Sequence, residues 1–444
     1  MLGFKFLGNT KVPHHKNTAA VKAVEIAPPR EILLPMQQHI GAPATPIVKE
    51  GDTVMVGQKI AEANGYVSSP IYSSVSGTVS KIENYLRPDG KIVQAVRITS
   101  DGEMNIYDGI TIPAVDSLDS LIEAVRESGV VGLGGAGFPT AVKLDAIKKG
   151  GIDTVVLNGA ECEPYITADT RTMLDESSWI YEGIKLLKTY APSVKKFIFG
   201  IESNKKEAIE EIARIFRDDD SVSVLPLPPL YPQGAEKILI YNTTGRVVPE
   251  GKLPADVGII VMNVTTLSSV AKYVKTGFPL VERCVTVDGS AIKEPKNLIV
   301  PIGTSIGEIL ASVSQTEDMG KVLFGGPMMG IAASNLNEPI TKTTGAITVL
   351  AKKDSKLIEP TACIHCGSCV YACPNGLNPT AYAKALNISN EKDKVELLEA
   401  EKINLCIECG CCSFVCPAHR PLVQNNKLAK AAVREYKAHI ATLK

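Results

Sequence analysis

Two cysteine-rich stretches, CIHCGSCVYACP at 363–374 and CIECGCCSFVCP at 406–417, decide how the last part of this chain folds. Both have the spacing C-x2-C-x2-C-x3-C-P, which is typical of a pair of [4Fe–4S] clusters. Two zinc ribbons are the alternative, although they would need two C-x2-C pairs some way apart. In the paired-cluster pattern the fourth cysteine of each run binds the other cluster. The spacing therefore predicts Cys363, Cys366, Cys369 and Cys416 as ligands of cluster 1, and Cys373, Cys406, Cys409 and Cys412 as ligands of cluster 2.

The composition excludes several classes of protein. A chain of 444 residues is long enough for about three or four domains. Its net charge of −1 leaves no basic stripe, so we expect no nucleic-acid partner. Nine of the eleven cysteines lie at metal-ligand spacing near the end, which indicates a reducing compartment. With no signal-peptide pattern and no apolar run of membrane-spanning length, we expect attachment to a membrane only through partners.

Hydrophobic spacing divides the chain into five segments. Residues 1–30 form an arm rich in Pro, Lys and His, expected to be a solvated tail that contacts a partner. Residues 31–110 contain short strands separated by glycine and proline turns. Residues 111–270 alternate helices with strands, as in a doubly wound α/β sheet. Short strands return in 271–352, a small α+β domain, and 353–444 is helical and holds the cysteine runs.

Within 31–110, two half-repeats pair a short strand with a glycine turn. The stretches at 51–54 and 57–60 resemble a barrel-sandwich hammerhead of the biotinyl/lipoyl type. That family carries its cofactor on a lysine in a hairpin between the halves, and the corresponding turn at 64–66 has no lysine. We therefore expect an interaction domain without a swinging arm.

The α/β segment provides the most detailed expectations. A helix should follow Asp116 as its N-cap. Strands are expected at 154–157, 196–201, 222–225 and 257–262, and helices at 169–190, 204–217 and 233–241. Ligands of such folds collect at the carboxyl ends of the strands.

A glycine-rich loop precedes the helix that carries Lys143. Gly132, Gly134, Gly135 and Gly137 crowd six positions, so backbone N–H groups there can approach an anion closely. Lys143 can reach a phosphate from the same helix. The loop does not match G-x-G-x-x-G strictly, and a tight structural turn is the alternative. We favour a nucleotide or flavin.

Polar residues follow the strand at 154–157. Asn158, Glu161 and Glu163 could bind a flavin ring or a ribose at that edge. The alternative is an ordinary turn asparagine with exposed acids.

The combined motifs resemble a known family. Gly-x-Gly-Gly-Ala-Gly-Phe-Pro-Thr-x-x-Lys at 132–143, followed by Asn-x-x-Glu-x-Glu-Pro at 158–164, resembles the FMN- and NADH-binding subunit of respiratory complex I. Tyr-Pro-Gln-Gly-Ala-Glu at 231–236 and Asn263 resemble later segments of that subunit. The order of segments, with Gly-Gly-Pro-Met-Met-Gly at 325–330, more specifically resembles the C subunits of Rnf electron-transport complexes. The resemblance covers nearly all of the chain.

The resemblance implies a multidomain α/β protein: a barrel-sandwich hammerhead, a Rossmann-like FMN/NADH domain, a β-grasp (SLBB-like) ligand-binding domain and a helical ferredoxin-type domain. It implies FMN, NADH and two [4Fe–4S] clusters. Electrons would pass between them in a peripheral subunit on the cytoplasmic face of a membrane-bound ferredoxin:NAD oxidoreductase coupled to ion translocation. The implied partners are a ferredoxin-like iron–sulfur subunit and membrane flavoprotein subunits. Two alternatives are a soluble flavin/iron–sulfur cobalamin reductase of a microcompartment and a non-catalytic two-cluster scaffold.

The resemblance also implies roles for single residues. FMN would be held by Gly132, Gly134, Gly135, Gly137, Lys143, Asn158, Glu161, Gly234 and Asn263. NADH would lie against Phe138, Glu163, Tyr231 and Glu236, and the acidic Glu163 and Glu236 would favour NADH over NADPH. The complex I family has Arg, Asp, Glu and Asn at four positions that here hold Leu133, Ala160, Ala235 and Met262. These departures predict that FMN is held more weakly or differently.

Overall fold

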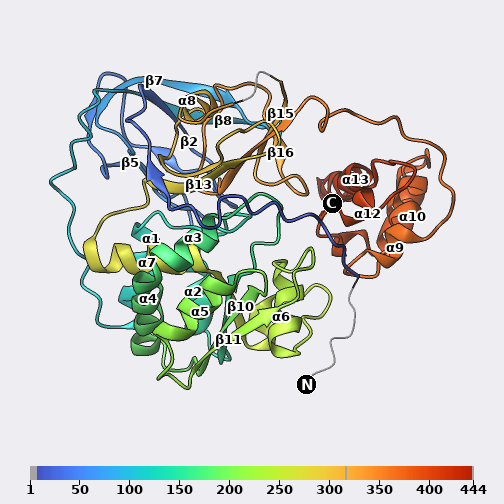
Figure 1. Cartoon of the computed structure of the whole chain (residues 1–444), viewed down its shortest axis with the longest axis horizontal. Coiled ribbons are helices and arrows are strands. Elements are labelled where there is room, and N and C mark those ends of the chain that lie inside the picture. The colour runs from blue at the N-terminus through green and yellow to red at the C-terminus, as the bar shows by residue number, and fades with distance from the viewer. Residues whose placement is uncertain (1–7, 316–317, 443–444) are drawn as a thin grey trace.

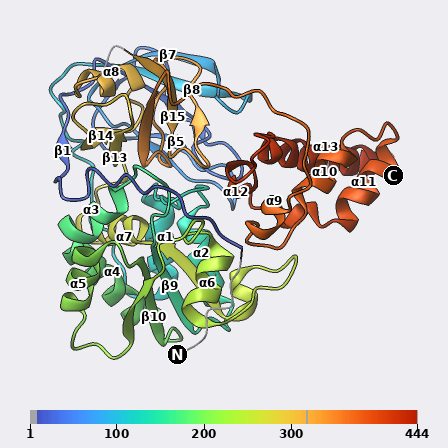
Figure 2. The same cartoon turned by 45° about the vertical axis from the view of Figure 1, so that its right-hand side comes forward.

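The structure, a computed structural model, describes residues 8–315 and 318–442 (Figure 1). Parts of three predicted segments, namely residues 1–7, 316–317 and 443–444, lie outside the described residues. Two lobes lie one above the other in Figures 1 and 2, and a helical unit, drawn in red, stands beside them. In the described part of the chain, no helix is long and apolar enough to cross a membrane.

The lower lobe is built on a four-stranded parallel sheet with the order β11-β10-β9-β12. Its strands are β9 (Thr154–Gly159), β10 (Lys196–Glu202), β11 (Val222–Leu227) and β12 (Ile259–Asn263). The prediction of four strands alternating with helices is confirmed. Apolar runs such as Val155–Leu157 are buried, because helices cover both faces of a parallel sheet.

The helices of this lobe are α1 (Leu118–Glu127), α2 (Thr140–Lys148), α3 (Ala168–Asp175), α4 (Ser177–Tyr190), α5 (Lys206–Ile215), α6 (Glu236–Thr244), the short 3-10 helix η1 (Pro254–Val257) and α7 (Val264–Thr276). Two expectations are wrong in detail. The helix expected at 169–190 is interrupted at Glu176, whose carboxylate accepts hydrogen bonds from Ser268 and Lys272 of α7. The N-cap of α1 is Ser117 rather than Asp116.

The segment 31–110 forms two small antiparallel sheets in the upper lobe. One contains β2 (Glu31–Pro35), β8 (Ile92–Ser100), β7 (Gly77–Leu86) and β4 (Thr53–Val54), and the other β3 (Thr45–Pro46), β5 (Lys59–Glu62) and β6 (Ile71–Tyr72). The turn between β5 and β6 touches the lower lobe, since the Tyr66 hydroxyl donates a hydrogen bond to Asp145 of α2. The expected role of this segment as an interaction domain stays a prediction.

A six-stranded mixed sheet completes the upper lobe, with α8 (Ile306–Ala311) packed against it. Its order is β1 (Val24–Glu25), β14 (Lys296–Pro301), β13 (Glu282–Asp288), β17 (Ala346–Ala351), β15 (Met319–Phe324) and β16 (Ile331–Ala332). Strands β13 and β14 form an antiparallel pair, whereas β13 and β17 run parallel.

The N-terminal arm is part of this fold, so the expectation of a solvated tail is wrong for the described residues. Strand β1 pairs with β14, and Thr10 exchanges two backbone hydrogen bonds with Tyr231. The ammonium group of Lys16 donates to the carbonyl oxygens of Glu161, Glu163 and Ile166 at 2.7, 2.8 and 2.7 Å. The arm therefore ties the two lobes together, as its path between them in Figure 2 illustrates.

The helical unit contains α9 (Ser368–Tyr371), α10 (Pro379–Ala385), α11 (Glu391–Ala400), the 3-10 helix η2 (Ile403–Leu405), α12 (Cys411–Phe414) and α13 (Leu422–Thr442). Its core includes Tyr382, Leu398 and Ile403, which are fully buried. Most elements of the four groups fall within the segments predicted from the sequence, but β1 of the six-stranded sheet comes from the arm, and α7 runs past the predicted limit at residue 270. The exact limits between the segments stay predictions.

Candidate flavin and iron–sulfur sites

The predicted flavin residues meet at the carboxyl edge of the parallel sheet. Asn158 is the penultimate residue of β9 and Asn263 ends β12, and the two are direct partners in the register of these strands. The glycine loop lies over the same edge: a Cβ atom added to Gly134 would stand only 2.6 Å from the Asn263 amide nitrogen. Only a glycine therefore fits at 134, and the loop is pressed against the strand ends.

The loop leaves its own backbone open to a ligand. Gly134, Gly135 and Ala136 are exposed, and a Cβ atom added to Gly135 would meet nothing within 4 Å. The N–H of Gly132 donates to the carbonyl oxygen of Phe138 at 2.9 Å and closes the turn at its base. Open backbone amides that lead into the N-terminus of α2 suit a phosphate group, so this loop fits the phosphate of FMN.

The two asparagines are held by a hydrogen-bond network. The side chain of Asn263 caps α7 and donates to a carboxylate oxygen of Asp169 at 2.7 Å. The Asn158 amide donates to the carbonyl oxygen of Gly234 at 3.0 Å. The Asp169 carboxylate also accepts from the Thr265 hydroxyl, and burial raises the pKa of this acid. Asp169 was not found from the sequence because it lies inside a helix start with no motif around it.

Lys143 and Glu236 are brought together across this edge. The ammonium group of Lys143 lies 3.3 Å from the Glu236 carboxylate and donates to the Val261 carbonyl oxygen at 3.0 Å. Glu236 is exposed at the first position of α6, and Phe138 is half-buried beside the glycine loop. These three side chains stay near open surface.

Glu161 has a local role in the structure. It has the left-handed φ of +47°, and its carboxylate accepts hydrogen bonds from the backbone of Asp169 and from Thr170 at the start of α3. Burial raises the pKa of Glu161 to about 7. The side chain therefore shapes the loop beside the asparagines, and its predicted contact with flavin stays a prediction.

Glu163 and Tyr231 lie where the lower lobe meets other parts of the chain. The two carboxylate oxygens of Glu163 accept the backbone N–H groups of Met328 and Met329 at 3.1 and 2.8 Å. Tyr231 is 1% exposed and its hydroxyl donates to the carbonyl oxygen of Cys409 at 2.8 Å. Both side chains are thus bound at contacts between segments, whereas Glu236 pairs with Lys143 at the exposed surface.

The thiols predicted for cluster 2 surround one hollow. It is lined by Cys373, Cys406, Cys409 and Cys412, and also by Asn426 from α13. The Asn426 amide lies 3.4 Å from the Cys406 sulfur and 3.9 Å from the Cys412 sulfur. Four thiolates with an amide donor fit an iron–sulfur cluster, whose sulfurs accept hydrogen bonds. Cys373 faces this hollow although its own sequence run belongs to the other cluster.

Three of the four cysteines predicted for cluster 1, namely Cys366, Cys369 and Cys416, lie near one another. Burial raises the pKa of the Cys369 thiol, and the nearby Cys416 and Cys366 raise it further. Cys369 is buried, whereas Cys366 is exposed. Among the described residues, no three His, Cys, Asp or Glu side chains form a group that could hold a single metal ion. An all-thiolate donor set of this kind suits an iron–sulfur cluster.

The loop that carries the predicted cluster 2 ligands packs on Tyr231 and Met328, and the segment of Tyr231 in turn adjoins the strand edge with the predicted flavin residues. Cys411, which is fully buried, lies with its sulfur 3.8 Å from the Tyr231 carbonyl oxygen. A Cβ atom on Gly410 would be 2.8 Å from the carbonyl oxygen of Met328. On the other side of Tyr231, the Cys162 sulfur accepts the N–H of Gly234. Of the two cysteine groups, the one predicted for cluster 2 therefore adjoins the flavin edge.

Sequence reasoning missed a group of buried charges beneath the loop at 160–163. Lys205 donates to the carbonyl oxygen of Ala160 at 2.7 Å and to the Glu202 carboxylate at 2.9 Å, and Lys16 approaches from the arm. The signal that could have found Glu202 is its position, because it directly follows the strand predicted at 196–201 and ends β10 of the parallel sheet. Nothing in the local sequence pointed to Lys16.

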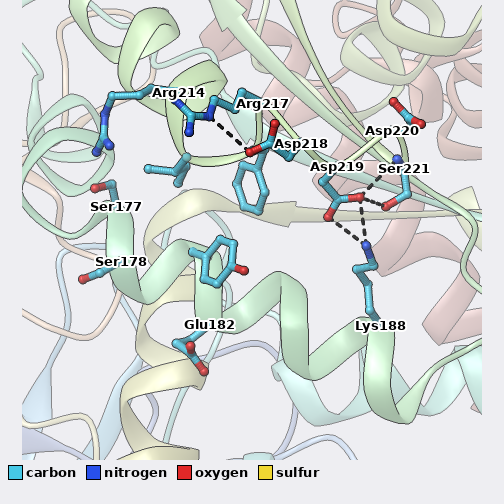
Figure 3. A pocket seen from close by; sticks show the side chains of 13 residues that line it. Ser177, Ser178, Glu182, Lys188, Arg214, Arg217, Asp218, Asp219, Asp220 and Ser221 are labelled. Carbon is cyan, nitrogen blue, oxygen red and sulfur yellow. Dashed lines mark hydrogen bonds and ion pairs between the residues drawn. The ribbon is translucent and has the colours of Figure 1, made fainter.

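A separate open hollow lies near the amino end of β11, away from the carboxyl ends of the strands where the predicted flavin residues lie (Figure 3). It is bordered by α4 and by the segment 214–221, and the Lys188–Asp219 ion pair forms part of its lining. None of the predicted site residues lines it. This hollow is not part of the flavin edge.

Three family models match the chain. Residues 4–103 match the RnfC barrel sandwich hybrid domain, residues 125–272 the Nuo51 FMN-binding domain, and residues 359–423 a 4Fe-4S dicluster domain. The second match contains the glycine loop and both asparagines, and the third contains all eight predicted ligand cysteines. The cofactors expected from the sequence are thus confirmed as FMN and two [4Fe–4S] clusters.

Similar proteins are known from several bacteria. The chain is 43% identical to the C component of the proton-translocating ferredoxin:NAD(+) oxidoreductase complex of Clostridium ljungdahlii, over 87% of this chain and 85% of that one. It is 42% identical to the C component of the Na(+)-translocating ferredoxin:NAD(+) oxidoreductase complex of Acetobacterium woodii, over 85% and 86%. It is 39% identical to the C component of the ion-translocating oxidoreductase complex of Rhodobacter capsulatus, over 97% and 84%.

A solved structure shares the fold. The crystal structure of an NAD+-reducing [NiFe]-hydrogenase in the H2-reduced state matches with a TM-score of 0.52 at 19% identity. The match covers 71% of this chain and 63% of the hydrogenase chain.

Proposed function

Since this chain belongs to the RnfC family, the C components of ion-translocating ferredoxin:NAD(+) oxidoreductase complexes, we propose that it exchanges electrons between NADH and the rest of such a complex through FMN and two [4Fe–4S] clusters. The chain is thereby an oxidoreductase component of a multi-subunit, ion-translocating assembly. Identity over almost the whole length favours this function over a microcompartment cobalamin reductase or a non-catalytic scaffold.

One observation carries the proposal. The segment 231–234 links the two predicted sites, because Asn158 donates to the Gly234 carbonyl oxygen and the Tyr231 hydroxyl donates to the Cys409 carbonyl oxygen in the loop predicted for cluster 2. Electrons that arrive at this edge therefore have a short, buried route to cluster 2. The second group of cysteines, with the exposed Cys366, then offers an exit toward a partner.

When bound, FMN supplies hydride chemistry with NADH and the clusters supply one-electron steps. The protein's own residues would bind the flavin and align it with the nicotinamide nucleotide. The glycine loop and Lys143 would hold the phosphate, while Asn158, Gly234 and Asn263 would position the ring. Phe138 and Glu236 lie on the open side, where a nicotinamide nucleotide can approach. Glu161, Glu163 and Tyr231 would fix the loops around it.

The finer features of fold and assembly belong to the same proposal. The two small sheets would be a barrel-sandwich hammerhead, the parallel sheet a Rossmann-like domain, the six-stranded sheet a β-grasp domain and the helical unit a ferredoxin-type domain. The protein would sit peripherally on the cytoplasmic face of the membrane. Its partners would be a ferredoxin-like iron–sulfur subunit and membrane flavoprotein subunits.

An anaerobic NADH titration tests the function. The purified chain, with clusters reconstituted, is followed by its visible spectrum and by EPR as NADH is added. Loss of the flavin absorption together with the appearance of reduced-cluster signals is the expected result. Full iron content with no flavin and no response to NADH would refute the dehydrogenase function and leave an electron-carrying scaffold.

A further inference from the structure

A buried arginine from the upper lobe reaches the glycine loop of the lower lobe. Arg283 lies on β13, 4% exposed, and its Nη2 donates a hydrogen bond to the carbonyl oxygen of Leu133 at 3.1 Å. The two residues are 150 positions apart. The flavin edge therefore receives a side chain from a sheet that does not otherwise build it.

The buried guanidinium group of Arg283 has few hydrogen-bond partners and no ion-pair partner among the described residues. Its Nε and Nη1 atoms are buried without a hydrogen-bond partner. Asp169 is near enough to act on its charge, but both oxygens of that carboxylate are engaged by Asn263 and Thr265. A buried cation without a bonded anion is costly, so a site that keeps one has a use for positive charge.

The glycine loop, which is expected to bind a phosphate, has no charged side chain of its own. Between Val131 and Thr140 the chain contributes no charged side chain. The backbone of Leu133 is fixed on both sides, since its N–H donates to the Thr266 hydroxyl at 2.9 Å and its carbonyl oxygen accepts from Arg283. The residues that follow, Gly134 to Ala136, are exposed and leave their backbone open.

We propose that Arg283 is a positioning residue for the phosphate of the bound flavin. It fixes the glycine loop through the Leu133 carbonyl oxygen, and it supplies a buried positive charge behind the loop that a phosphate on the open side neutralises. Because its free N–H groups are shielded from solvent, Arg283 acts through the loop and through its charge without touching the phosphate. This inference rests on the proposed flavin function and adds a residue from a different domain to that site.

The test compares two ligands that differ only in the phosphate. Flavin is removed from the full-length chain, and dissociation constants for FMN and for riboflavin are measured by fluorescence quenching. The variants are Arg283→Gln, Arg283→Lys and the control Arg171→Gln. Arg171 is similarly buried, but its guanidinium is paired with Asp175 and with the Ala19 carbonyl oxygen. The melting temperature of each flavin-free protein is recorded as well.

Arg283→Gln should weaken FMN binding roughly tenfold to a hundredfold, the range of one charge-assisted interaction, and leave riboflavin binding unchanged. Arg283→Lys keeps the charge and should recover part of the loss. The flavin-free Arg283→Gln protein should melt at the same temperature or higher, because an uncompensated buried cation is gone. Arg171→Gln should melt lower and keep the wild-type preference for FMN over riboflavin.

Equal losses for FMN and riboflavin in Arg283→Gln, together with a lower melting temperature, would show that Arg283 only holds the lobes together. An unchanged ratio of the two dissociation constants would also overturn the inference while leaving the proposed function standing. A wild-type chain that binds neither flavin would refute the proposed function itself.

Discussion

The Tyr231 hydroxyl donates a hydrogen bond to the carbonyl oxygen of Cys409, and this 2.8 Å contact spans 178 positions of sequence. Tyr231 also exchanges backbone hydrogen bonds with Thr10 of the arm. One residue therefore connects the flavin edge, the cluster 2 loop and the N-terminal arm. We therefore expect its side chain to help fix the distance between the two proposed redox sites.

Replacing Tyr231 with Phe keeps the ring and removes this hydrogen bond. We expect a loss of about 1–2 kcal/mol in stability, since a buried carbonyl loses its partner. NADH-driven cluster reduction, followed by stopped-flow absorbance, should slow by roughly three- to tenfold, because small misplacements between reacting groups are costly.

Tyr382→Phe is the matched control, because the Tyr382 hydroxyl also donates to a backbone carbonyl oxygen, that of Glu401, but within the helical unit. It should lose similar stability without slowing the transfer. Equal rates in the two variants would contradict the role assigned to Tyr231.

The exchange of the fourth cysteines between clusters gives a second prediction. Cys373→Ser should behave like Cys406→Ser, and Cys416→Ser like Cys366→Ser, each losing about four irons per chain. In the first pair NADH should no longer reduce the remaining cluster, whereas dithionite still should, because the cluster next to the flavin edge is missing. EPR spectra recorded after adding NADH and after adding dithionite show whether each reductant reduces the remaining cluster. Identical EPR behaviour of Cys373→Ser and Cys366→Ser would refute the assignment.

The burial of Lys342 leads us to expect that the free energy of unfolding depends on pH. Its ammonium group is buried between the lobes and donates to Ser69, to the Pro70 carbonyl oxygen and to the Gly129 carbonyl oxygen at 3.1, 2.6 and 2.7 Å. Burial lowers its pKa from 10.5 to about 7. Between these values the unfolded chain binds more protons, so the free energy of unfolding should rise with pH, by up to about 1.4 kcal/mol per unit.

Urea unfolding of the flavin-free chain at pH 7 and pH 9 checks this expectation. Lys342→Met should remove most of the rise, whereas Lys352→Met, at an exposed position, should keep it. If wild type and Lys342→Met gain the same free energy between the two pH values, Lys342 is not the titrating group.

The choice between NADH and NADPH should depend on Glu236. Its exposed carboxylate, paired with Lys143, would repel the 2′-phosphate of NADPH. Glu236→Gln should raise kcat/KM for NADPH relative to NADH by about two- to fivefold, as for a surface charge. Glu163→Gln should leave the ratio unchanged, because that carboxylate is bound to the amides of Met328 and Met329. The opposite pattern would assign the selectivity to Glu163.

Local sequence signals were enough for the elements of the parallel sheet. Strand β9 was expected at 154–157 and extends over Thr154–Gly159, because a short run of buried Val and Leu is visible within a few residues. The glycine loop and the cysteine runs were equally clear, since their chemistry requires residues at fixed spacing. The position of Asn158 followed from the rule that ligands collect where parallel strands end, whereas Asn263 was found only through the family resemblance.

The contacts that join distant segments could not be predicted in this way. Lys16 binds carbonyl groups at least 145 positions away, and the arm around it has no apolar period. Arg283 looks like any strand residue until the fold brings it to Leu133. Tyr231 and Glu163 were assigned to the nicotinamide side, yet their hydrogen bonds lie at contacts between domains. Such contacts depend on how the segments pack, which no short window of sequence contains.

The arm has a further consequence for biosynthesis. It is translated before the segments it contacts: its strand β1 needs β14, and a Cβ atom on Gly8 would stand only 2.1 Å from the Cys373 carbonyl oxygen. Since domains fold in turn as they are made, the arm must wait until these later segments have been translated. We therefore expect the contact between the arm, Tyr231 and the cluster 2 loop to form only after the residues of both predicted cofactor sites have been made.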